Sequence, residues 1–399
     1  MESSVATGDA SAAANSDAAL RASEALAPLS TPARHMYVHV PFCARRCSYC
    51  DFSIAVRNVV PVDRYIAALA AEMDSYNTAA VELDTLYLGG GTPSRLGGEG
   101  VAGVISLVRS RTMMAPDAEI TIEANPDDVT AASARAWRAA GVNRVSLGAQ
   151  SFDEGVLEWM HRAHSATQIG DAVRLLKDSG IDNISVDLIF ALPPEISRDW
   201  SADLDRALAL EPRHISLYGL TVEAHTPLAR WRERGSVTDA PEESYETEFM
   251  LAHERLVAAG LDHYEVSNFG QPGFRSRHNS AYWSGVPYIG LGPSAHGFDI
   301  RTRQWNVAAY AQWERLLASG QSAIGGLEVL TPANRAAERV YLGLRTDAGL
   351  TATDAELDIV RPWLTQGWAI LRDGAIVLTP SGLLRLDALA AFLTHAGSL

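Results

Sequence analysis

The chain has 399 residues, 47% of them hydrophobic, with a formal net charge of −15 and a pI near 5.2. This length supports an ordinary hydrophobic core divided into two or three units. The negative charge repels phosphate backbones, so we expect no nucleic-acid partner. The sequence has no apolar run long enough to cross a bilayer and no apolar signal core near its start, which predicts a cytoplasmic protein.

Residues 1–34 are rich in Ala, Ser, Thr and Asp and have too few bulky apolar residues for a core, so they predict a disordered leader. From residue 35 to about residue 225, short apolar segments alternate with longer helical patterns. Six such β-α units favour an α/β fold built as a partial (β/α)6 barrel, with ligands at the carboxyl ends of the strands. We expect strands near 36–40, 84–88, 119–123, 144–148, 184–190 and 214–218, with helices such as 63–76, 131–140 and 168–179 between them.

The pattern changes twice after the predicted barrel. Residues 226–330 contain an acidic helix start and then a stretch rich in Gly, Pro and aromatic residues, which predicts an accessory region acting as a lid or sheet extension. Residues 331–399 contain helical patterns followed by a hairpin signal at Asp373-Gly374, which predicts a winged-helix-like C-terminal domain. Because this segment has few basic residues, a packing or docking role is favoured over DNA binding.

The only three cysteines are Cys43, Cys47 and Cys50, at Cys-x3-Cys-x2-Cys spacing on a loop after the first strand. Three thiolates that converge on a four-iron cluster leave one iron open to a small molecule. Disulfide pairing would leave one cysteine over. Structural zinc is the alternative, but it normally needs four closed ligands, and a strand and a proline separate His39 from the loop.

A run of glycines follows the second predicted strand. Gly89, Gly90 and Gly91 precede Thr92, and consecutive glycines let the backbone approach a ligand closely. Glycines after a strand also make plain turns. The stretch lacks the spacing and lysine of a P-loop, and it does not match the dinucleotide fingerprint.

Polar residues recur at the ends of later strands. Glu123, Gln150 and Asp187 each interrupt an apolar segment at a similar depth. A buried polar side chain costs free energy unless it has a partner, so their repetition predicts a shared polar ligand, although each one alone fits a satisfied core residue. Arg162 either pairs with a carboxylate of that ligand or is a solvated helix charge.

A third group lies in "RHNSAYWSGVPYIGLGPSAHG", which contains His278, Asn279, Tyr282 and Trp283. A histidine beside large aromatic rings can ligate the iron of a flat macrocycle while the rings pack on its face. A histidine among aromatic residues is also a common hydrogen-bonded structural residue. The residues by themselves leave both interpretations open.

Together, the cysteine loop, the glycine run and the strand-end polar residues resemble the radical S-adenosylmethionine superfamily. From Met36 to the C-terminus, the chain is similar to the oxygen-independent coproporphyrinogen III oxidase family within it. The resemblance implies a 4Fe-4S cluster on the three cysteines, with S-adenosylmethionine as cosubstrate and an electron donor for the cluster. It implies cosubstrate-binding roles for Tyr37, Tyr49, Gly90, Gly91, Thr92, Glu123, Gln150, Arg162 and Asp187.

Two features separate this chain from the decarboxylating oxidases of that family. Phe52 stands where those enzymes carry a further cysteine, and His278-Asn279-x-x-Tyr282-Trp283 resembles the motif of the heme chaperone (HemW) branch. This branch implies that heme binds near the motif and passes to an acceptor hemoprotein. An acceptor in a respiratory complex would bring the chain into peripheral contact with the membrane.

Other interpretations stay open at this point. The chain is a monomer or a homodimer, and whether it acts as an enzyme is not decided by its residues. One alternative is radical decarboxylation of coproporphyrinogen III to protoporphyrinogen. The other is a radical enzyme acting on nucleic acid, which the acidic composition disfavours.

Overall fold

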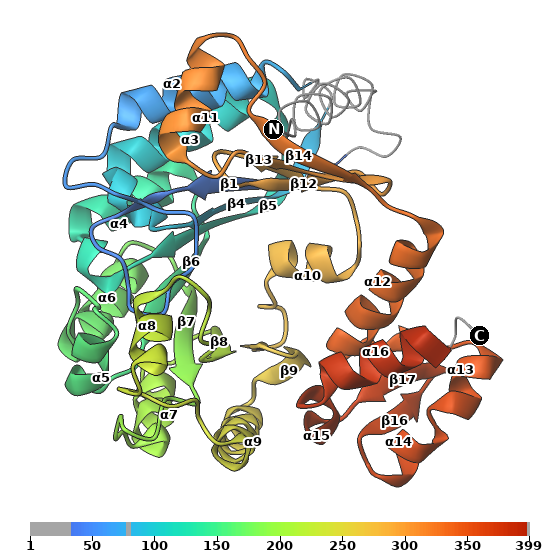
Figure 1. Cartoon of the computed structure of the whole chain (residues 1–399). Helices are drawn as coiled ribbons and strands as arrows, with labels where there is room; N and C mark the ends of the chain where they lie inside the picture. Colours follow the sequence, from blue (N-terminus) through green and yellow to red (C-terminus); the bar gives the residue numbers. More distant parts are fainter. Residues whose placement is uncertain (1–32, 77–80, 397–399) are drawn as a thin grey trace, which may run out of the picture.

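The computed structural model describes residues 33–76 and 81–396, and its central element is a nine-stranded sheet (Figure 1). The first seven strands in spatial order are parallel, and the last two extend the far edge through antiparallel pairings. In spatial order, the strands are β11 (Ile289–Leu291), β1 (His35–Val40), β4 (Glu82–Gly90), β5 (Met113–Ala124), β6 (Arg144–Gln150), β7 (Asn183–Phe190), β8 (His214–Gly219), β10 (Asn268–Gly270) and β9 (Asp262–Glu265).

The six strands predicted from the sequence are all present as β1 and β4 to β8. Their segments are nearly continuous apolar runs, as expected for parallel strands that are covered on both faces. The predicted leader lies outside the described residues except for Ala33 and Arg34. Arg34 Nε donates to Asp84 Oδ2 at 2.6 Å, which fixes the chain just before β1.

Helices cover the outer face of the curved sheet (Figure 1). The three helices predicted between strands are present, one with the predicted ends and two with ends shifted by one to three residues. Two short 3-10 turns, η1 (Pro93–Leu96) and η2 (Pro126–Asp128), follow β4 and β5. The helices are α2 (Val62–Met73), α3 (Gly97–Arg111), α4 (Ala131–Ala140), α5 (Glu154–Trp159), α6 (Ala166–Asp178) and α7 (Trp200–Ala209).

Helix α6 shows why these segments fold as they do. Ser165 and Gln168 form a capping box, which satisfies backbone N–H groups at the helix start. Its apolar side chains then recur at i, i+3, i+4 and i+7, so that one face packs on the sheet. The buried residues on this face are Ile169, Ala172, Val173 and Leu176.

The accessory region extends the sheet at both edges, as β11 pairs with β1 and β10 pairs with β8. This confirms a sheet extension within residues 226–330. A separate three-stranded sheet in the order β12-β13-β14 lies above β1 and β4 (Figure 1). The further elements are α8 (Pro227–Glu233), α9 (Glu242–Ala258), α10 (Arg277–Trp283), β12 (His296–Phe298), β13 (Thr302–Asn306), α11 (Tyr310–Ala318) and β14 (Ile324–Val329).

The C-terminal region has its own apolar core, which includes Leu344, Trp363 and Ile376. The predicted hairpin is present, with φ of 52° at Asp373 and 80° at Gly374, and two positive φ values are typical of a type I′ turn. The winged-helix-like assignment and the exact domain boundaries stay predictions. The elements are α12 (Pro332–Arg345), β15 (Leu350–Thr351), α13 (Asp354–Ile359), α14 (Arg361–Thr365), β16 (Ala369–Arg372), β17 (Ala375–Leu378), α15 (Pro380–Leu383) and α16 (Leu386–Ala396).

Across the described ranges, no helix is long and apolar enough to span a membrane.

Candidate functional site

The cysteine loop leaves the carboxyl end of β1 and is closed at its base by a short parallel pairing of β2 (Phe42–Cys43) with β3 (Ala55–Val56). Ser48 N donates to Met160 O at 3.2 Å, which ties the middle of the loop to the barrel. The three thiols are free, and burial raises the pKa of Cys43 and raises that of Cys50 to about 11. Without a bound metal to stabilise the thiolate, a buried thiol keeps its proton.

Two side chains contact the thiols. The Cys43 Sγ lies 3.3 Å from the Thr92 hydroxyl, and Arg162 Nη1 donates to Cys47 Sγ at 3.4 Å. In residues 33–76 and 81–396, no three His, Cys, Asp or Glu side chains come close enough to hold one metal ion. A four-iron cluster does not require that convergence, because each thiolate binds a different iron. The arrangement therefore fits a cluster better than a closed zinc site.

The loop opens onto a cavity of about 480 Å³ at the carboxyl ends of the strands, which we call the cofactor cavity. A cavity of this size is typical of small-molecule sites. It gathers almost all of the residues that the sequence singled out for the cluster and the cosubstrate. They are Cys43, Cys47, Tyr49, Cys50, Gly90, Gly91, Thr92, Glu123, Gln150, Arg162 and Asp187.

Arg162 is a half-buried cation between the cysteine loop and the strand ends. Besides its contact with Cys47, its Nη2 donates to Asn125 Oδ1 at 2.7 Å and to Gly148 O at 2.8 Å. Its Nε has no partner in the described part of the chain. A solvated helix charge is therefore the wrong interpretation of this residue, and the buried donor remains free for a polar ligand.

Two of the carboxylates that line the cavity, Glu123 and Asp187, are half-buried and hydrogen-bonded. Glu123 accepts from the Tyr87 hydroxyl at 2.8 Å and from Gly90 N at 2.9 Å, and burial raises its pKa to about 7. Asp187 accepts from the hydroxyls of Ser146 and Ser185 at 2.9–3.1 Å, and burial also raises its pKa. Both groups are held rigidly at the end of a strand, where they can orient polar groups of a ligand.

Gly90 and Gly91, at the end of β4, have no room for a side chain because they pack closely against His39 and Pro41. Gly90 has φ of +108°, and a Cβ there would lie 2.5 Å from the His39 ring. A Cβ on Gly91 would lie 2.7 Å from the backbone carbonyl of Pro41. Only glycine therefore lets the end of β4 run so close to the start of the cysteine loop, and this keeps backbone groups exposed to the cavity.

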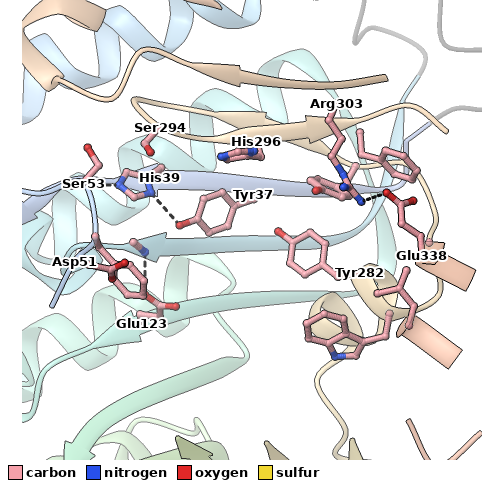
Figure 2. A pocket seen from close by; sticks show the side chains of 17 residues that line it. Tyr37, His39, Asp51, Ser53, Glu123, Tyr282, Ser294, His296, Arg303 and Glu338 are labelled. Atoms are coloured by element: carbon pink, nitrogen blue, oxygen red, sulfur yellow. Dashed lines mark hydrogen bonds and ion pairs between the residues drawn. The ribbon is translucent and has the colours of Figure 1, made fainter. Parts of the chain in front are cut away.

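A second cavity of about 660 Å³ adjoins the first, and both are lined by Asp51, Phe52, Gly90 and Glu123. We call it the aromatic cavity. Figure 2 shows Tyr37 and Tyr282 facing the space between His39 at one end and the Arg303–Glu338 pair at the other. Tyr37 therefore contributes to this cavity, whereas the sequence assigned it to the cosubstrate.

The His-Asn-x-x-Tyr-Trp motif forms helix α10, and its members do not share one environment. Tyr282 and Trp283 line the aromatic cavity, but His278 and Asn279 do not. His278 is 1% exposed, with Nδ1 2.7 Å from the Thr85 hydroxyl and Nε2 2.9 Å from the Tyr282 hydroxyl. In this structure His278 positions Tyr282, and a direct contact of His278 with heme stays a prediction.

Sequence reasoning assigned no role to several residues of the aromatic cavity, although it noted His296 after the motif. His296 lies in the same glycine-rich stretch as the motif, but its spacing carries no distinguishing pattern. Arg303 and Glu338 come from β13 and α12, and no local signal connects them. Only the packing of the accessory sheet on β1 brings His39, His296 and Arg303 to one space.

The parallel sheet and the three-cysteine loop at its carboxyl edge define a radical SAM protein, and residues 37–207 match the radical SAM superfamily. The fold is similar to that of the Escherichia coli coproporphyrinogen III oxidase HemN, a radical SAM enzyme. The TM-score is 0.78 and the identity 21%, and the match covers 93% of this chain and 92% of that one. Membership of this superfamily implies a 4Fe-4S cluster and S-adenosylmethionine as cofactors.

Sequence relatives give the closer grouping. The chain is 38% identical over 379 residues to the heme chaperone HemW of Mycobacterium tuberculosis, and this alignment covers 92% of this chain and 96% of the relative. It is 32% identical over 372 residues to the heme chaperone HemW of Bacillus subtilis, and this alignment covers 91% of this chain and 96% of the relative. The chain belongs to the HemW family.

Proposed function

We propose that this protein is a heme chaperone that binds heme beside a 4Fe-4S cluster and S-adenosylmethionine and delivers the heme to an acceptor hemoprotein. The observation that carries the proposal is the aromatic cavity, which shares a wall with the cofactor cavity and is lined by Tyr282 and Trp283 of the family motif. A flat apolar macrocycle fits a cavity with aromatic walls because its faces bury well against rings.

The cofactor cavity would hold the family's resident groups. Cys43, Cys47 and Cys50 would bind three irons and leave the fourth open to the amino and carboxylate groups of S-adenosylmethionine. When bound and reduced, these groups supply one-electron chemistry that the protein itself does not. The half-buried polar residues would orient the nucleoside and methionine parts: Glu123, Gln150, Arg162 and Asp187.

The strongest competing function is decarboxylation of coproporphyrinogen III. The complete set of residues expected to bind the cluster and S-adenosylmethionine favours this decarboxylation, because a protein that only carries heme has no evident need for those cofactors. Phe52 argues against it, since the oxidases have a cysteine at this position. Its side chain is 60% exposed and lines both cavities.

The proposal implies further partners. An electron donor would reduce the cluster, and an acceptor hemoprotein would receive the heme. We expect the protein to act in the cytoplasm, with peripheral membrane contact when the acceptor is a respiratory complex. We expect no nucleic-acid partner, because the net charge of −15 opposes it. The chain would act as a monomer or a homodimer.

One experiment separates the two functions. Protein reconstituted anaerobically with iron and sulfide is incubated with hemin, desalted, and assayed for retained heme as the pyridine hemochrome. We expect stoichiometric heme that moves to a heme-free acceptor upon mixing, and no protoporphyrinogen from coproporphyrinogen III with reductant and S-adenosylmethionine. Failure to retain hemin would refute the chaperone function, and turnover of coproporphyrinogen would establish the oxidase instead.

A variant at the shared wall adds a control. Phe52→Cys introduces the residue that the oxidases carry at this position. If the lack of decarboxylation depends on this one side chain, the variant gains activity. We expect it to stay inactive while retaining hemin, because the walls of the aromatic cavity are otherwise unchanged.

A further inference from the structure

The β12–β13 ribbon presents one face to the aromatic cavity. In its register, His296 is opposite Trp305 and Phe298 is opposite Arg303, so all four side chains lie on the same face. The His296 and Trp305 rings stack with centroids 5.8 Å apart and planes inclined by 27°. His296 and Arg303 are diagonal neighbours on this face, at about 7–8 Å between backbone positions.

His296 differs from the other histidines near this cavity because its ring nitrogens are free. Both nitrogens of His278 are hydrogen-bonded. His39 is bonded at Nδ1 to the Tyr37 hydroxyl (3.1 Å) and lies at Nε2 3.0 Å from Ser53 O. His296 is partly exposed, and neither of its ring nitrogens has a hydrogen-bond partner among residues 33–76 and 81–396. An imidazole with a free lone pair in an aromatic cavity is suited to bind a metal.

The protonation state of His296 agrees with this role. Partial burial lowers its pKa below the ordinary value near 6.5, and the nearby positive charge of Arg303 lowers it further. The other titratable side chains that line the cavity are Tyr37, His39, Asp51, Glu123, Tyr282, Tyr288 and Glu338. Burial lowers the pKa of His39 and raises that of Glu123. A lowered pKa favours the neutral ring, which is the form of imidazole that binds a metal.

Arg303 provides a cation at one end of the cavity (Figure 2). Its Nη2 donates to Glu338 at 2.8 Å, and its guanidinium carbon lies 5.6 Å from the centre of the Phe298 ring. A guanidinium has five N–H donors, so the bond to Glu338 leaves others for a carboxylate of a ligand. Arg335 of α12 lies beside the same phenyl ring at 5.5 Å and adds positive charge at this end.

We propose that His296 is the axial ligand of the heme iron and that Arg303 binds a heme propionate, so the macrocycle lies along the β12–β13 face. This inference rests on the proposed function and specifies its site. It assigns His278 to positioning Tyr282 from behind the cavity wall. It also defines the ligand class as a metalloporphyrin with carboxylate groups on one edge.

Two porphyrins test the assignment in cluster-loaded protein. Hemin carries iron and propionates, and protoporphyrin IX carries only the propionates. His296→Ala should weaken hemin binding by about 10-fold or more and leave protoporphyrin IX binding unchanged, because only an iron ligand distinguishes the two. External imidazole should restore the resonance Raman signature of a ligated iron. Arg303→Met should weaken both porphyrins alike.

The results distinguish a failure of the proposed function from a failure of the His296 assignment. If the unsubstituted protein does not retain hemin, the proposed function fails. If the unsubstituted protein retains hemin and His296→Ala binds hemin as tightly, His296 is not the axial ligand. The same conclusion follows if His296→Ala loses hemin and protoporphyrin IX equally. In both cases the chaperone function stands. His278→Ala should affect both porphyrins equally, and a selective loss of hemin there would assign the ligand to His278. Unchanged iron content in each variant shows that it is folded.

Discussion

The two adjoining cavities are built in different ways. The cofactor cavity is formed where consecutive β-α units of one barrel end, and its half-buried charged side chains are held by hydrogen bonds to neighbouring backbone and side chains. The aromatic cavity is formed between the end of β1, helix α10, the β12–β13 ribbon and α12. The first cavity lies within one barrel, and the second is a space with aromatic walls between separately packed elements.

This difference indicates a division of roles. A preorganised set of charged groups suits a resident cofactor whose geometry must be fixed. A cavity between an added sheet and a C-terminal helix suits a molecule that must enter and leave, because its walls belong to different packing units. The shared wall of Asp51, Phe52, Gly90 and Glu123 places the two functions side by side.

The largest expected effect is loss of the cluster from the cofactor cavity while hemin binding in the aromatic cavity is unchanged. Cys47→Ser replaces a thiolate ligand with a hydroxyl that stays protonated at neutral pH, so we expect most cluster iron and sulfide to be lost after reconstitution. Hemin retention should persist because the aromatic cavity does not include Cys47. Val59→Ser, at a side chain that is 84% exposed, is the matched control. Full cluster content in Cys47→Ser would contradict the assignment.

A smaller effect is expected at the half-buried cation of the cofactor cavity. Arg162→Met removes charge-assisted hydrogen bonds, each worth about 1.5–3 kcal/mol, and should weaken S-adenosylmethionine binding roughly 10- to 100-fold. Calorimetric titration of cluster-loaded protein with S-adenosylmethionine measures this change in affinity. Arg174→Met, on the exposed face of α6, is the control. An equal loss of hemin affinity would show that the two cavities are not independent.

The last prediction concerns stability rather than binding, at the wall behind the aromatic cavity. Buried Glu72 on α2 accepts from Gly292 N at 2.9 Å, Trp313 Nε1 at 3.1 Å and the Asn306 side chain, and so joins α2 to the accessory region. Burial raises the pKa of Glu72 from 4.5 to about 7. The folded state therefore holds this proton more tightly than the unfolded state does. Its stabilising contribution is present below pH 4.5 and is lost as the pH rises through 7.

Urea unfolding of the cluster-free protein between pH 5 and pH 8 tests this linkage. The stability of the unsubstituted chain relative to Glu72→Gln should fall by about 2–3 kcal/mol over this range. A difference that is constant with pH would mean that the three donors keep Glu72 ionised throughout.

Much of the barrel and of the cofactor cavity was predictable from local patterns. Parallel strands are marked by apolar runs, and their carboxyl ends meet at one edge, so Glu123, Gln150 and Asp187 had to be close together. Arg162 was ambiguous, because a helix charge and a half-buried cation look identical in sequence. Tyr37 was matched to the cosubstrate, and only its contact with His39 places it beside the aromatic cavity.

The sequence by itself determined the single three-cysteine loop, the order of the β-α units and the family motif at His278. The tertiary structure alone decided which way that motif faces. Glu119 of β5 accepts from the backbone N–H groups of Arg277 and His278 at the start of α10, and this contact turns His278 into the core and Tyr282 towards the cavity. The physical reason is that cysteine spacing is local chemistry, whereas the rotation of a seven-residue helix depends on partners more than 150 residues away.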